Sequence, residues 1–446
     1  MKKNFWKSVG LLMLLSGLTT TAFAEGNDTT AVGLSSTQEG SKTLSFSLEE
    51  AKQYALEHNR SVQNASYDVQ KAEATRWKSI ASMLLQVSGN VDYYNMLNYK
   101  MEMLGTEIPM PAYFDFGISA SMSVSGTQIV SVKVAKLSKQ IYETTVNKTE
   151  QSVTSNIETY YINILALQKT VELLEKNLEN LTNLHNMTLN AVKAGAAEQN
   201  DADQVEIQVS SLASSLNTTK RSIEVLYNSI RLLTGAEADD EIVLTQSLDD
   251  VINAGEILSL LGTDFNIEDN YDYQLQTKST ELKKKQLTLS KMAYVPTLSA
   301  FYSFDKKKYC SDEETLDMTP PNTVGFKLSV PIFSTGSRWA DVRGAKMDYA
   351  KEVNNLKDAT QNLNIQEKQL RYNLTSSYED YQIQSKNIEV MQRVFDSNSE
   401  KYKYGTISSL SLTNSSTDLI SAQNTYVSSL LEMVTAYVSL RNLLNK

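Results

Sequence analysis

Side chains that commonly carry out chemistry are scarce in this 446-residue sequence, which has one cysteine, Cys310, and two histidines, His58 and His185. A single cysteine excludes a disulfide framework, and three such side chains are too few for the usual zinc sites. Neither histidine lies in a recognisable catalytic motif, and we find no nucleophile-base pair or phosphate-binding loop. We therefore expect no enzymatic activity, no metal and no cofactor, and we interpret Cys310 as an incidental thiol.

The composition favours a folded chain of long helices. Apolar residues make up 41% of the sequence and charged residues 21%, which is enough apolar surface for a core. Only 17 glycines and 6 prolines occur, although average usage would give roughly 30 and 22. This shortage of helix breakers argues against loop-rich sandwiches and propellers. The formal net charge of −10 gives no electrostatic reason to bind nucleic acid.

The first 24 residues have the pattern of a secretory signal peptide. Three lysines among the first seven residues precede an apolar stretch from Leu11 to Leu18 and an A-x-A cleavage site at Ala22–Ala24. We predict cleavage after residue 24 and a flexible segment over 25–45. The mature net charge would be −13, because three positive charges are removed from a total of −10. No later run of about 18 apolar residues occurs, so the exported chain would be either soluble or part of a membrane β-barrel.

The mature sequence is internally duplicated. An offset of 210 residues aligns four pairs of identical residues: Gly195 with Gly405, Tyr227 with Tyr437, Ser229 with Ser439, and Arg231 with Arg441. A repeat of this length is too long for a solenoid and implies a pseudo-symmetric protomer. We divide the chain into a first repeat over 46–235, an acidic equatorial linker over 236–264 and a second repeat over 265–446.

Each repeat is expected to contain one helix, two strands and two long helices. A capping box formed by Ser47 and Glu50 opens the first helix. The expected helices are 48–84, 127–192 and 198–234 in the first repeat, and 267–293, 335–402 and 407–444 in the second. The expected strands are 85–94 and 113–125 in the first repeat, and 296–304 and 323–332 in the second.

The long helices have the apolar spacing of coiled coils. From Val153 to Leu181, and from Val205 to Leu233 with one polar exception, core positions recur at alternating steps of four and three. Joined through Ala194–Ala196, two such helices would form an antiparallel hairpin. A first helix that begins near residue 130 would be about 95 Å long at 1.5 Å per residue. The alternative is an ordinary core stripe in a helical bundle.

The strands have the alternation typical of transmembrane β-strands. Every second residue from Phe114 to Val124 is apolar or small, with small or polar residues between them, and Leu85–Tyr93, Leu298–Phe304 and Val324–Val330 alternate likewise. Aromatic residues gather near the strand ends, as in the interfacial girdles of membrane proteins. The alternative is a soluble, half-buried sheet.

Four strands are too few to close a membrane barrel. The smallest such barrels have about eight strands, and lipid does not tolerate open sheet edges. Three copies would supply twelve strands, and the same threefold axis would let the long hairpins form a helical tube. The sequence therefore predicts a mainly α-helical protomer with a small transmembrane β part, within an exported oligomeric conduit.

Several stretches match a known family: Leu48–Asn59, Tyr294–Ser299, Val324–Gly336 and the hairpin tip Lys401–Gly405. Through them, and through the order and duplication of its elements, the chain from residue 46 onward resembles the TolC-like outer-membrane efflux and secretion channels of Gram-negative bacteria. The resemblance implies a homotrimer in which long antiparallel coiled-coil hairpins form a periplasmic α-barrel. It also implies that the four strands of each protomer contribute to a shared 12-stranded barrel in the outer membrane.

The function that the resemblance implies is passive export from the periplasm to the exterior. The chain would be the channel of a tripartite efflux or type I secretion system, opened by a periplasmic adaptor (a membrane fusion protein) and an inner-membrane pump. Its location would be the cell outer membrane, with a long periplasmic extension. The exported substrate and the class of pump and adaptor are not readable from the sequence.

The family's periplasmic gate carries over only in part. Gly195 and Gly405 match the tips of the two hairpins. In the family's closed state, an Asp six residues after the first tip glycine bonds a Tyr three residues before the second, and these places hold Asp201 and Tyr402. The family's Arg, two residues after the second glycine, is replaced by Ile407. We predict a latch between Asp201 and Tyr402; the alternative is that both are solvated tip residues.

The family's acidic ring at the channel entrance is also incomplete. Its positions, six and nine residues after the second tip glycine, hold Ser411 and Asn414. Asp201 and Asp203, in three copies each, would instead make a weaker acidic constriction.

Two other regions have a predicted place. Segment 236–269 contains ten acidic residues and no Lys or Arg. It lies where the family has its equatorial belt, and it is either a solvated linker or a docking surface for an adaptor. The loops 95–112 and 305–322 join paired strands and should face the cell exterior, with Cys310 in the second loop.

The competing interpretation is a periplasmic coiled-coil adaptor or structural protein without its own membrane barrel. Adaptors usually have one hairpin between β-rich domains. This sequence predicts two hairpins and only four strands, which favours the channel.

Overall fold

The computed structural model describes residues 42–446 other than 98, 104, 252–253 and 311–319. Residues 43–446 form the unit that contains the described helices and strands. The predicted signal peptide and most of the segment 25–45 lie outside the described residues.

The described chain is mainly helical, which confirms the expected fold class at that level. The first repeat contains β1 (Thr43–Phe46), α2 (Leu48–His58), α3 (Arg60–Ala81), β2 (Gln86–Tyr94), β3 (Lys100–Met103), β4 (Thr106–Pro109), β5 (Tyr113–Val124), α4 (Gly126–Lys193) and α5 (Gln199–Thr234). The connecting segment contains β6 (Glu241–Leu244), α6 (Leu248–Val251) and α7 (Ala254–Leu261). The second repeat contains a 3-10 turn (Ile267–Asp269), α8 (Tyr271–Met292), β7 (Thr297–Tyr309), β8 (Asn322–Ser329), α9 (Ser337–Lys403) and α10 (Ser409–Leu444).

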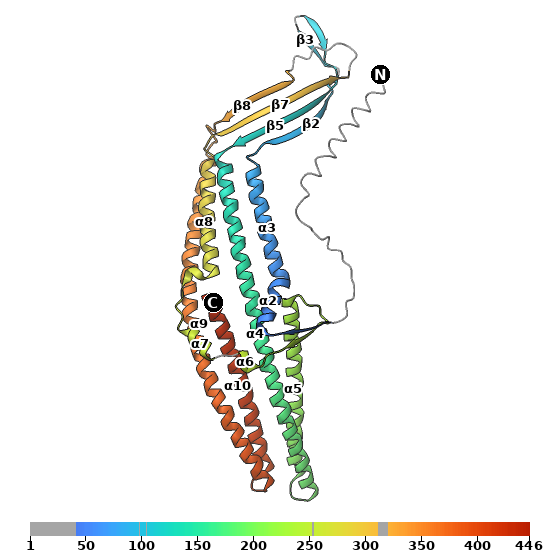
Figure 1. The fold of residues 1–446 in the computed structure, drawn as a ribbon, viewed down its shortest axis with the longest axis vertical. Helices are drawn as coiled ribbons and strands as arrows, with labels where there is room; N and C mark the ends of the chain where they lie inside the picture. The colour runs from blue at the N-terminus through green and yellow to red at the C-terminus, as the bar shows by residue number, and fades with distance from the viewer. Residues whose placement is uncertain (1–41, 98, 104, 252–253, 311–319) are drawn as a thin grey trace. The chain divides into compact units, whose positions relative to one another are not determined.

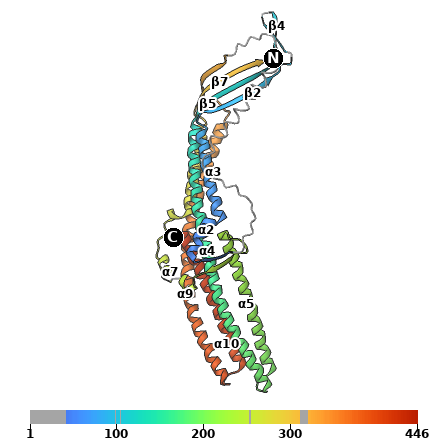
Figure 2. The ribbon, with the colours of Figure 1, turned by 45° about the vertical axis from the view of Figure 1, so that its right-hand side comes forward.

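Two long antiparallel hairpins dominate this unit. α4 has 68 residues and pairs with α5, and α9 has 67 residues and pairs with α10. At 1.5 Å per residue, α4 is about 100 Å long. Figures 1 and 2 show the turns of both hairpins at the same end, with α10 and α4 side by side.

The helix expected over 48–84 is divided at Asn59, so this prediction is wrong in that detail. The Asn59 side-chain oxygen accepts hydrogen bonds from the backbone N–H groups of Ser61 and Val62, at 2.8 and 3.3 Å, and caps α3. Its amide nitrogen donates to the Leu233 carbonyl at the end of α5, at 2.8 Å. The first N–H groups of α3 have no carbonyl partner within the helix, because the chain is extended at Asn59, and the buried Asn59 side chain satisfies two of them.

Asn270 repeats this arrangement in the second half. Its side-chain oxygen accepts from the N–H groups of Asp272 and Tyr273, at 2.9 and 3.2 Å, and its amide donates to the Leu443 carbonyl, at 3.0 Å. The sequence predicted a helix from residue 267, but α8 begins at Tyr271. The internal duplication therefore includes one buried asparagine in each repeat. Asn59 ties the start of α3 to the end of α5, and Asn270 ties the start of α8 to the end of α10.

Four strands form an antiparallel sheet in the order β2-β5-β7-β8, with β2 and β8 at its edges. It lies at the opposite end of α4 and α9 from the hairpin turns (Figure 1). The pairing between β5 and β7 continues to Tyr113 and Tyr309, so β7 extends beyond the expected end at 304. The expected loop 95–112 contains a second hairpin, β3–β4.

The register gives the sheet two chemically different faces. The apolar face comprises Val87, Gly89, Val91 and Tyr93 of β2, Phe114, Phe116, Ile118, Ala120, Met122 and Val124 of β5, Leu298, Ala300, Tyr302 and Phe304 of β7, and Val324, Phe326 and Leu328 of β8. The residues between them form the polar face, which is rich in serine.

Two segments that the sequence places outside the repeats, residues 43–45 and the acidic segment, are folded in the structure. β1 pairs in parallel with β6, so residues 43–45 are not a flexible tail. The acidic segment folds onto α9, whose Arg371 donates hydrogen bonds to the carbonyls of Leu261 and Thr263, at 2.5 and 2.8 Å. These bonds cap carbonyls at the end of α7, and buried Ile257 and Leu260 pack in one cluster with Leu374 of α9.

Apolar clusters join the two repeats. Near the middle of α4, Ile162 packs in one cluster with Leu374 of α9 and Met433 of α10. Near the hairpin turns, Leu181 of α4 and Leu419 of α10 are buried in another. The core therefore runs along the shared surface of the two hairpins.

Candidate functional site

The hairpin turns are built on the same helix ending. Gly195 and Gly405 have φ of +73° and +68°, a conformation that favours glycine. Gly195 N–H donates to Val192 O at 2.9 Å, and the next N–H, of Ala196, donates to Ala191 O at 2.8 Å. Gly405 and Thr406 make the same pair of bonds, which defines a Schellman motif in both repeats.

The Tyr402 hydroxyl lies beside a partner that the sequence did not reveal. It is 3.3 Å from the hydroxyl of Thr188 on α4, which is fully buried. Thr188 donates its own hydrogen to the Leu184 carbonyl at 3.0 Å, so Tyr402 is the donor in the pair. Tyr402 thus links the second hairpin to the first through α4.

The two aspartates lie in the first turns of α5. Asp203 accepts a hydrogen bond from the Gln199 amide at 2.7 Å and is exposed, whereas Asp201 is half-buried. Among the described tip residues, no hydrogen bond joins Asp201 to Tyr402. The latch therefore stays a prediction, and it would require Tyr402 to leave Thr188.

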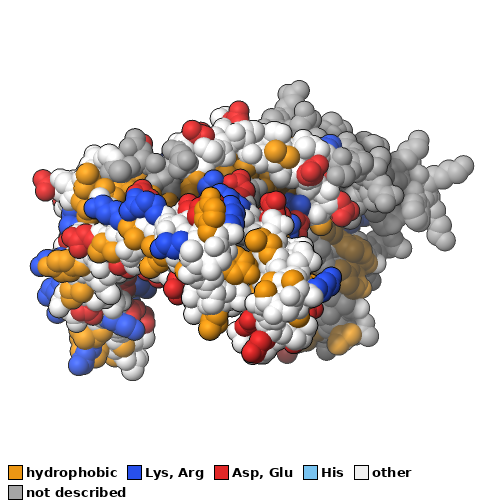
Figure 3. Space-filling model, turned by 90° about the horizontal axis from the view of Figure 1, so that it is seen from below, with side chains coloured by type: hydrophobic (Ala, Val, Ile, Leu, Met, Phe, Trp, Pro, Cys, Tyr) orange, Lys and Arg blue, Asp and Glu red, His pale blue; other side chains and the backbone are white. Residues whose placement is uncertain are grey.

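The remaining gate positions differ in chemistry from the family. Ile407 packs partly buried against the apolar cluster at the turns, so this position supplies packing and no charge. The Ser411 N–H donates to Ser408 Oγ at 3.2 Å, which caps α10. Ser411 and Asn414 are exposed. In the view from below, acidic, basic and apolar side chains are interspersed over the surface (Figure 3).

Further from the hairpin turns, a buried pair of side-chain amides joins α4 to α10. Asn177 of α4 donates to the side-chain oxygen of Gln423 on α10 at 2.6 Å, and both residues are buried. Such a pair inside an apolar seam favours one register, because sliding either helix would leave both amides without partners.

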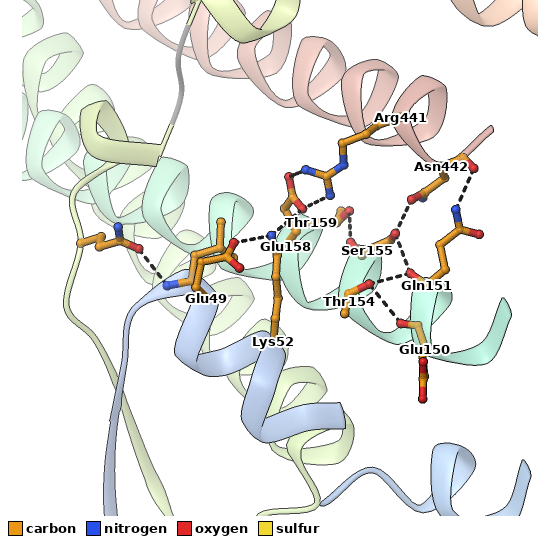
Figure 4. Close-up of polar contacts among 12 residues, drawn as sticks. Glu49, Lys52, Glu150, Gln151, Thr154, Ser155, Glu158, Thr159, Arg441 and Asn442 are labelled. Carbon is orange, nitrogen blue, oxygen red and sulfur yellow. Dashed lines mark hydrogen bonds and ion pairs between the residues drawn. The ribbon is translucent and has the colours of Figure 1, made fainter. Parts of the chain in front are cut away.

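A buried ion-pair network joins α4 to the C-terminal end of α10 (Figure 4). The Glu158 carboxylate, only 3% exposed, binds both terminal nitrogens of Arg441, with one at 2.8 Å, and lies 3.2 Å from Lys52 Nζ. Burial lowers the Arg441 pKa, but the hydrogen bond and charge of Glu158 outweigh it and leave the pKa raised. Ser155 and Gln151 extend the contact through hydrogen bonds to Asn442.

The sequence contained a weak signal for this network. Arg441 aligns with Arg231 in the duplication, and Arg231 also acts as an anchor, through bonds of 2.7 Å to the Asp240 carbonyl and to Glu224. Two arginines at equivalent helix ends suggest a shared structural role. Their partners, however, come from different elements, and only the fold reveals them.

Cys310 follows β7 and is exposed, with its N–H donating to the Ala112 carbonyl at 2.7 Å.

In the part of the chain that the structure describes, no helix has the length and apolar content needed to cross a membrane. The same residues include no group of three or more His, Cys, Asp or Glu placed to hold a metal ion.

The chain matches the family model described as outer membrane efflux protein over residues 52–236 and 272–446. The two matched parts coincide with the two repeats, and the unmatched part between them holds most of the acidic segment. The chain therefore belongs to the outer membrane efflux protein family. A comparison with curated proteins finds no match.

Similar solved structures include outer-membrane channels. CusC, described in terms of transmembrane channel formation, is 16% identical with a TM-score of 0.75, and the match covers 92% of this chain and 95% of CusC. VceC of Vibrio cholerae is 13% identical with a TM-score of 0.73, covering 89% of this chain and 95% of VceC. The open state of the MtrE channel of Neisseria gonorrhoeae is 16% identical with a TM-score of 0.73, covering 89% and 88%. The shared fold extends over almost the whole described chain.

Proposed function

We propose that this protein is the outer-membrane channel of a tripartite efflux or type I secretion system. It would act as a passive conduit from the periplasm to the exterior, opened by a periplasmic adaptor and an inner-membrane pump. The observation that carries the proposal is the four-stranded sheet with an exposed apolar face, held at one end of two long helical hairpins. Conduction through such a path needs no covalent chemistry, in agreement with a non-enzymatic role.

The sheet is incomplete as a single copy. Val324 and Phe326 on the edge strand β8 are 76% and 82% exposed, and the outer sides of β2 and β8 have no strand partner among the described residues. Exposed apolar side chains and open edges favour association with lipid and with further strands. A homotrimer would join β8 of one protomer to β2 of the next and close a barrel of twelve strands.

The long hairpins suit the periplasmic part of such a trimer. Their seams are apolar, and their register is fixed by the pair Asn177–Gln423 and by the bond between Tyr402 and Thr188. Three pairs of hairpins around one axis would form an α-barrel that ends at Gly195 and Gly405. Adaptor and pump would engage this end or the equatorial segment 236–269.

The periplasmic gate would lie at the hairpin turns. In the closed state Asp201 would accept a hydrogen bond from Tyr402, and in the described state Tyr402 donates to Thr188. With Ile407 in place of the family's Arg, the latch has one bond fewer, so it would open at lower cost. Asp201 and Asp203 would form a weak acidic constriction, while Ser411 and Asn414 remain neutral.

The division of the chain follows from this proposal. Residues 1–24 would be removed on export, the repeats 46–235 and 265–446 would each supply two strands and one hairpin, and 236–264 would form the equatorial belt.

Single-channel conductance in planar bilayers tests the proposal. The purified full-length protein should migrate as a heat-sensitive trimer and form pores, and Asp201→Ala and Tyr402→Phe should change the single-channel conductance. A protein that forms neither trimers nor pores would contradict the channel function. Unchanged conductance in both variants would contradict only the latch.

Labelling of intact cells tests the topology independently. Cys310 should react with an impermeant maleimide. In a Cys310→Ser background, Ser411→Cys at the hairpin turn should react only after the outer membrane is permeabilised. Reversed labelling would contradict the proposed orientation.

A further inference from the structure

Three tyrosines form a continuous row across the polar face of the sheet. The register places Tyr94 of β2 opposite Tyr113 of β5, and Tyr113 opposite Tyr309 of β7. The ring centres of Tyr94 and Tyr113 are 5.2 Å apart, and those of Tyr113 and Tyr309 are 5.4 Å apart. Both distances lie within the range of attractive contacts between aromatic rings. We call Tyr94, Tyr113 and Tyr309 the tyrosine row.

The tyrosine row lies at the end of the sheet that is furthest from the long helices. Tyr94 and Tyr309 end their strands, and Tyr113 begins β5, whose other end leads into α4 (Figure 1). Tyr94 is 44% exposed, whereas Tyr113, which lies between two rings, is half-buried. In the proposed barrel the polar face lines the lumen, so the row would surround the outer mouth of the channel. The inference below therefore rests on the proposed function.

The ring of Tyr113 already contacts a cation. Lys307 of β7 places its Nζ 5.4 Å from the centre of that ring, which is within the distance at which an ammonium group is attracted to an aromatic face. The lysines on either side of Lys307 belong to the rows of the apolar face. The contact shows that the tyrosine row can bind positive charge through the faces of its rings.

The two rows next to the tyrosine row carry an excess of negative charge. Asp115 lies opposite Asp92 on one side and opposite Lys307 on the other. Asp305 lies one row further toward the helices, so the two rows contain three carboxylates and one ammonium group. The other lysine of the polar face, Lys327, lies near the opposite end of the sheet. The charge beside the tyrosine row therefore favours cations over anions.

We propose that the tyrosine row binds aromatic organic cations at the outer mouth of the channel. An aromatic ring of such a compound stacks on the exposed ring of Tyr94, and its positive charge is attracted by the ring faces and by Asp92 and Asp115. Aromatic anions lack the second attraction, and aliphatic cations lack the stacking. In the proposed trimer, three such rows would surround the lumen. The substrate class that this surface favours is the aromatic cation.

Binding of ethidium, a planar aromatic cation, to the purified full-length trimer tests the site. Its dissociation constant can be measured by fluorescence anisotropy in an uncharged detergent. Tyr113→Leu removes the central ring and should raise the constant about fivefold, whereas Tyr113→Phe keeps the ring and should change it by less than about twofold. Lys307→Gln removes the ammonium group that competes for this ring and should lower the constant about threefold.

Tyr93→Leu is the matched control, because it removes the neighbouring tyrosine of β2 from the apolar face. It should change the dissociation constant of ethidium by less than about twofold. If Tyr113→Leu forms no trimer, Tyr309→Leu supplies the same comparison, because it removes the ring at the end of the row and should raise the constant about threefold.

Three results would overturn the site. The first is equal ethidium binding by Tyr93→Leu and Tyr113→Leu, or by Tyr93→Leu and Tyr309→Leu. The second is equal affinity for the aromatic anion pyranine, and the third is displacement of ethidium by tetraethylammonium, an aliphatic cation, at the same concentration.

Conductance in planar bilayers separates the failure of this site from the failure of the channel function. Pores formed by the unmodified protein, together with unaltered ethidium binding in Tyr113→Leu, contradict only the tyrosine row as a binding site. Failure of the unmodified protein to form trimers and pores contradicts both proposals.

Discussion

Removal of the Glu158 charge should destabilise the junction between the two repeats. Glu158→Gln keeps the size of the side chain but takes the anion away from Arg441. The Glu158 and Arg441 side chains are 4% and 20% exposed. Water can therefore replace only part of the interaction that the guanidinium loses with the carboxylate. Lys52 keeps Glu49, at 2.8 Å, as a second carboxylate.

The expected cost follows from this burial. Breaking a buried pair from one side costs about 3–5 kcal/mol, and the partial exposure of Arg441 places the value near about 3 kcal/mol. With an unfolding entropy of about 2.1 cal/mol/K per residue, about 400 residues that unfold together would lose about 3–4 °C in the midpoint. The midpoint can be followed by circular dichroism of the helices in detergent.

A double-mutant cycle separates the interaction energy of Glu158 and Arg441 from the other effects of each substitution on stability. Glu158→Met with Arg441→Met replaces both charges by apolar side chains and should recover most of the loss of either single change. Glu172→Gln, which removes an exposed partner of Lys169, should shift the midpoint by less than about 1 °C. If Glu158→Gln behaves like Glu172→Gln, or if the double variant loses the sum of its single changes, the reasoning is refuted.

Three further predictions concern the sheet, the duplicated amide and acid stability. Val324→Arg, in the middle of the apolar face, should cost about 2–4 kcal/mol and lower the amount of heat-sensitive trimer, whereas Ser303→Arg at the same level of the polar face should not; equal yields would contradict the assignment of the faces. Asn59→Ala and Asn270→Ala should each cost about 1–2 kcal/mol in denaturant unfolding, and clearly unequal losses would argue against a shared role. Backbone and side-chain bonds from Ser47 lower the Glu50 pKa below 4.5, so its contribution is present above that pH and lost as pH falls through the lowered pKa. The midpoint of Glu50→Gln should therefore depend less on pH between about 5 and 3 than that of the unmodified protein.

Local periodicity accounts for the features that the sequence predicted well. The steps of four and three from Val153 to Leu181 require one helical face, and α4 contains this whole stretch. Alternation from Phe114 to Val124 requires a strand with two faces, and β5 has that register. Glycine at 195 and 405 supplies the positive φ of both turns.

Features that depend on distant partners could not be predicted in this way. The break at Asn59 requires the carbonyl of Leu233, and the order of β1 requires β6, nearly 200 residues away. The Thr188 partner of Tyr402 was also missed, because nothing in the spacing of either helix sets which residues face each other across two hairpins.

By itself, the sequence determined the duplicated order of elements, the helical and strand periods, and the membership of a channel family, because these depend on residues close together in the chain. Only the tertiary structure decided which side chains meet: Glu158 with Arg441, Asn177 with Gln423, and Lys307 of β7 with the Tyr113 ring of β5. The physical reason is that packing and strand register select these partners from many compatible residues, at separations where the sequence pattern carries no signal.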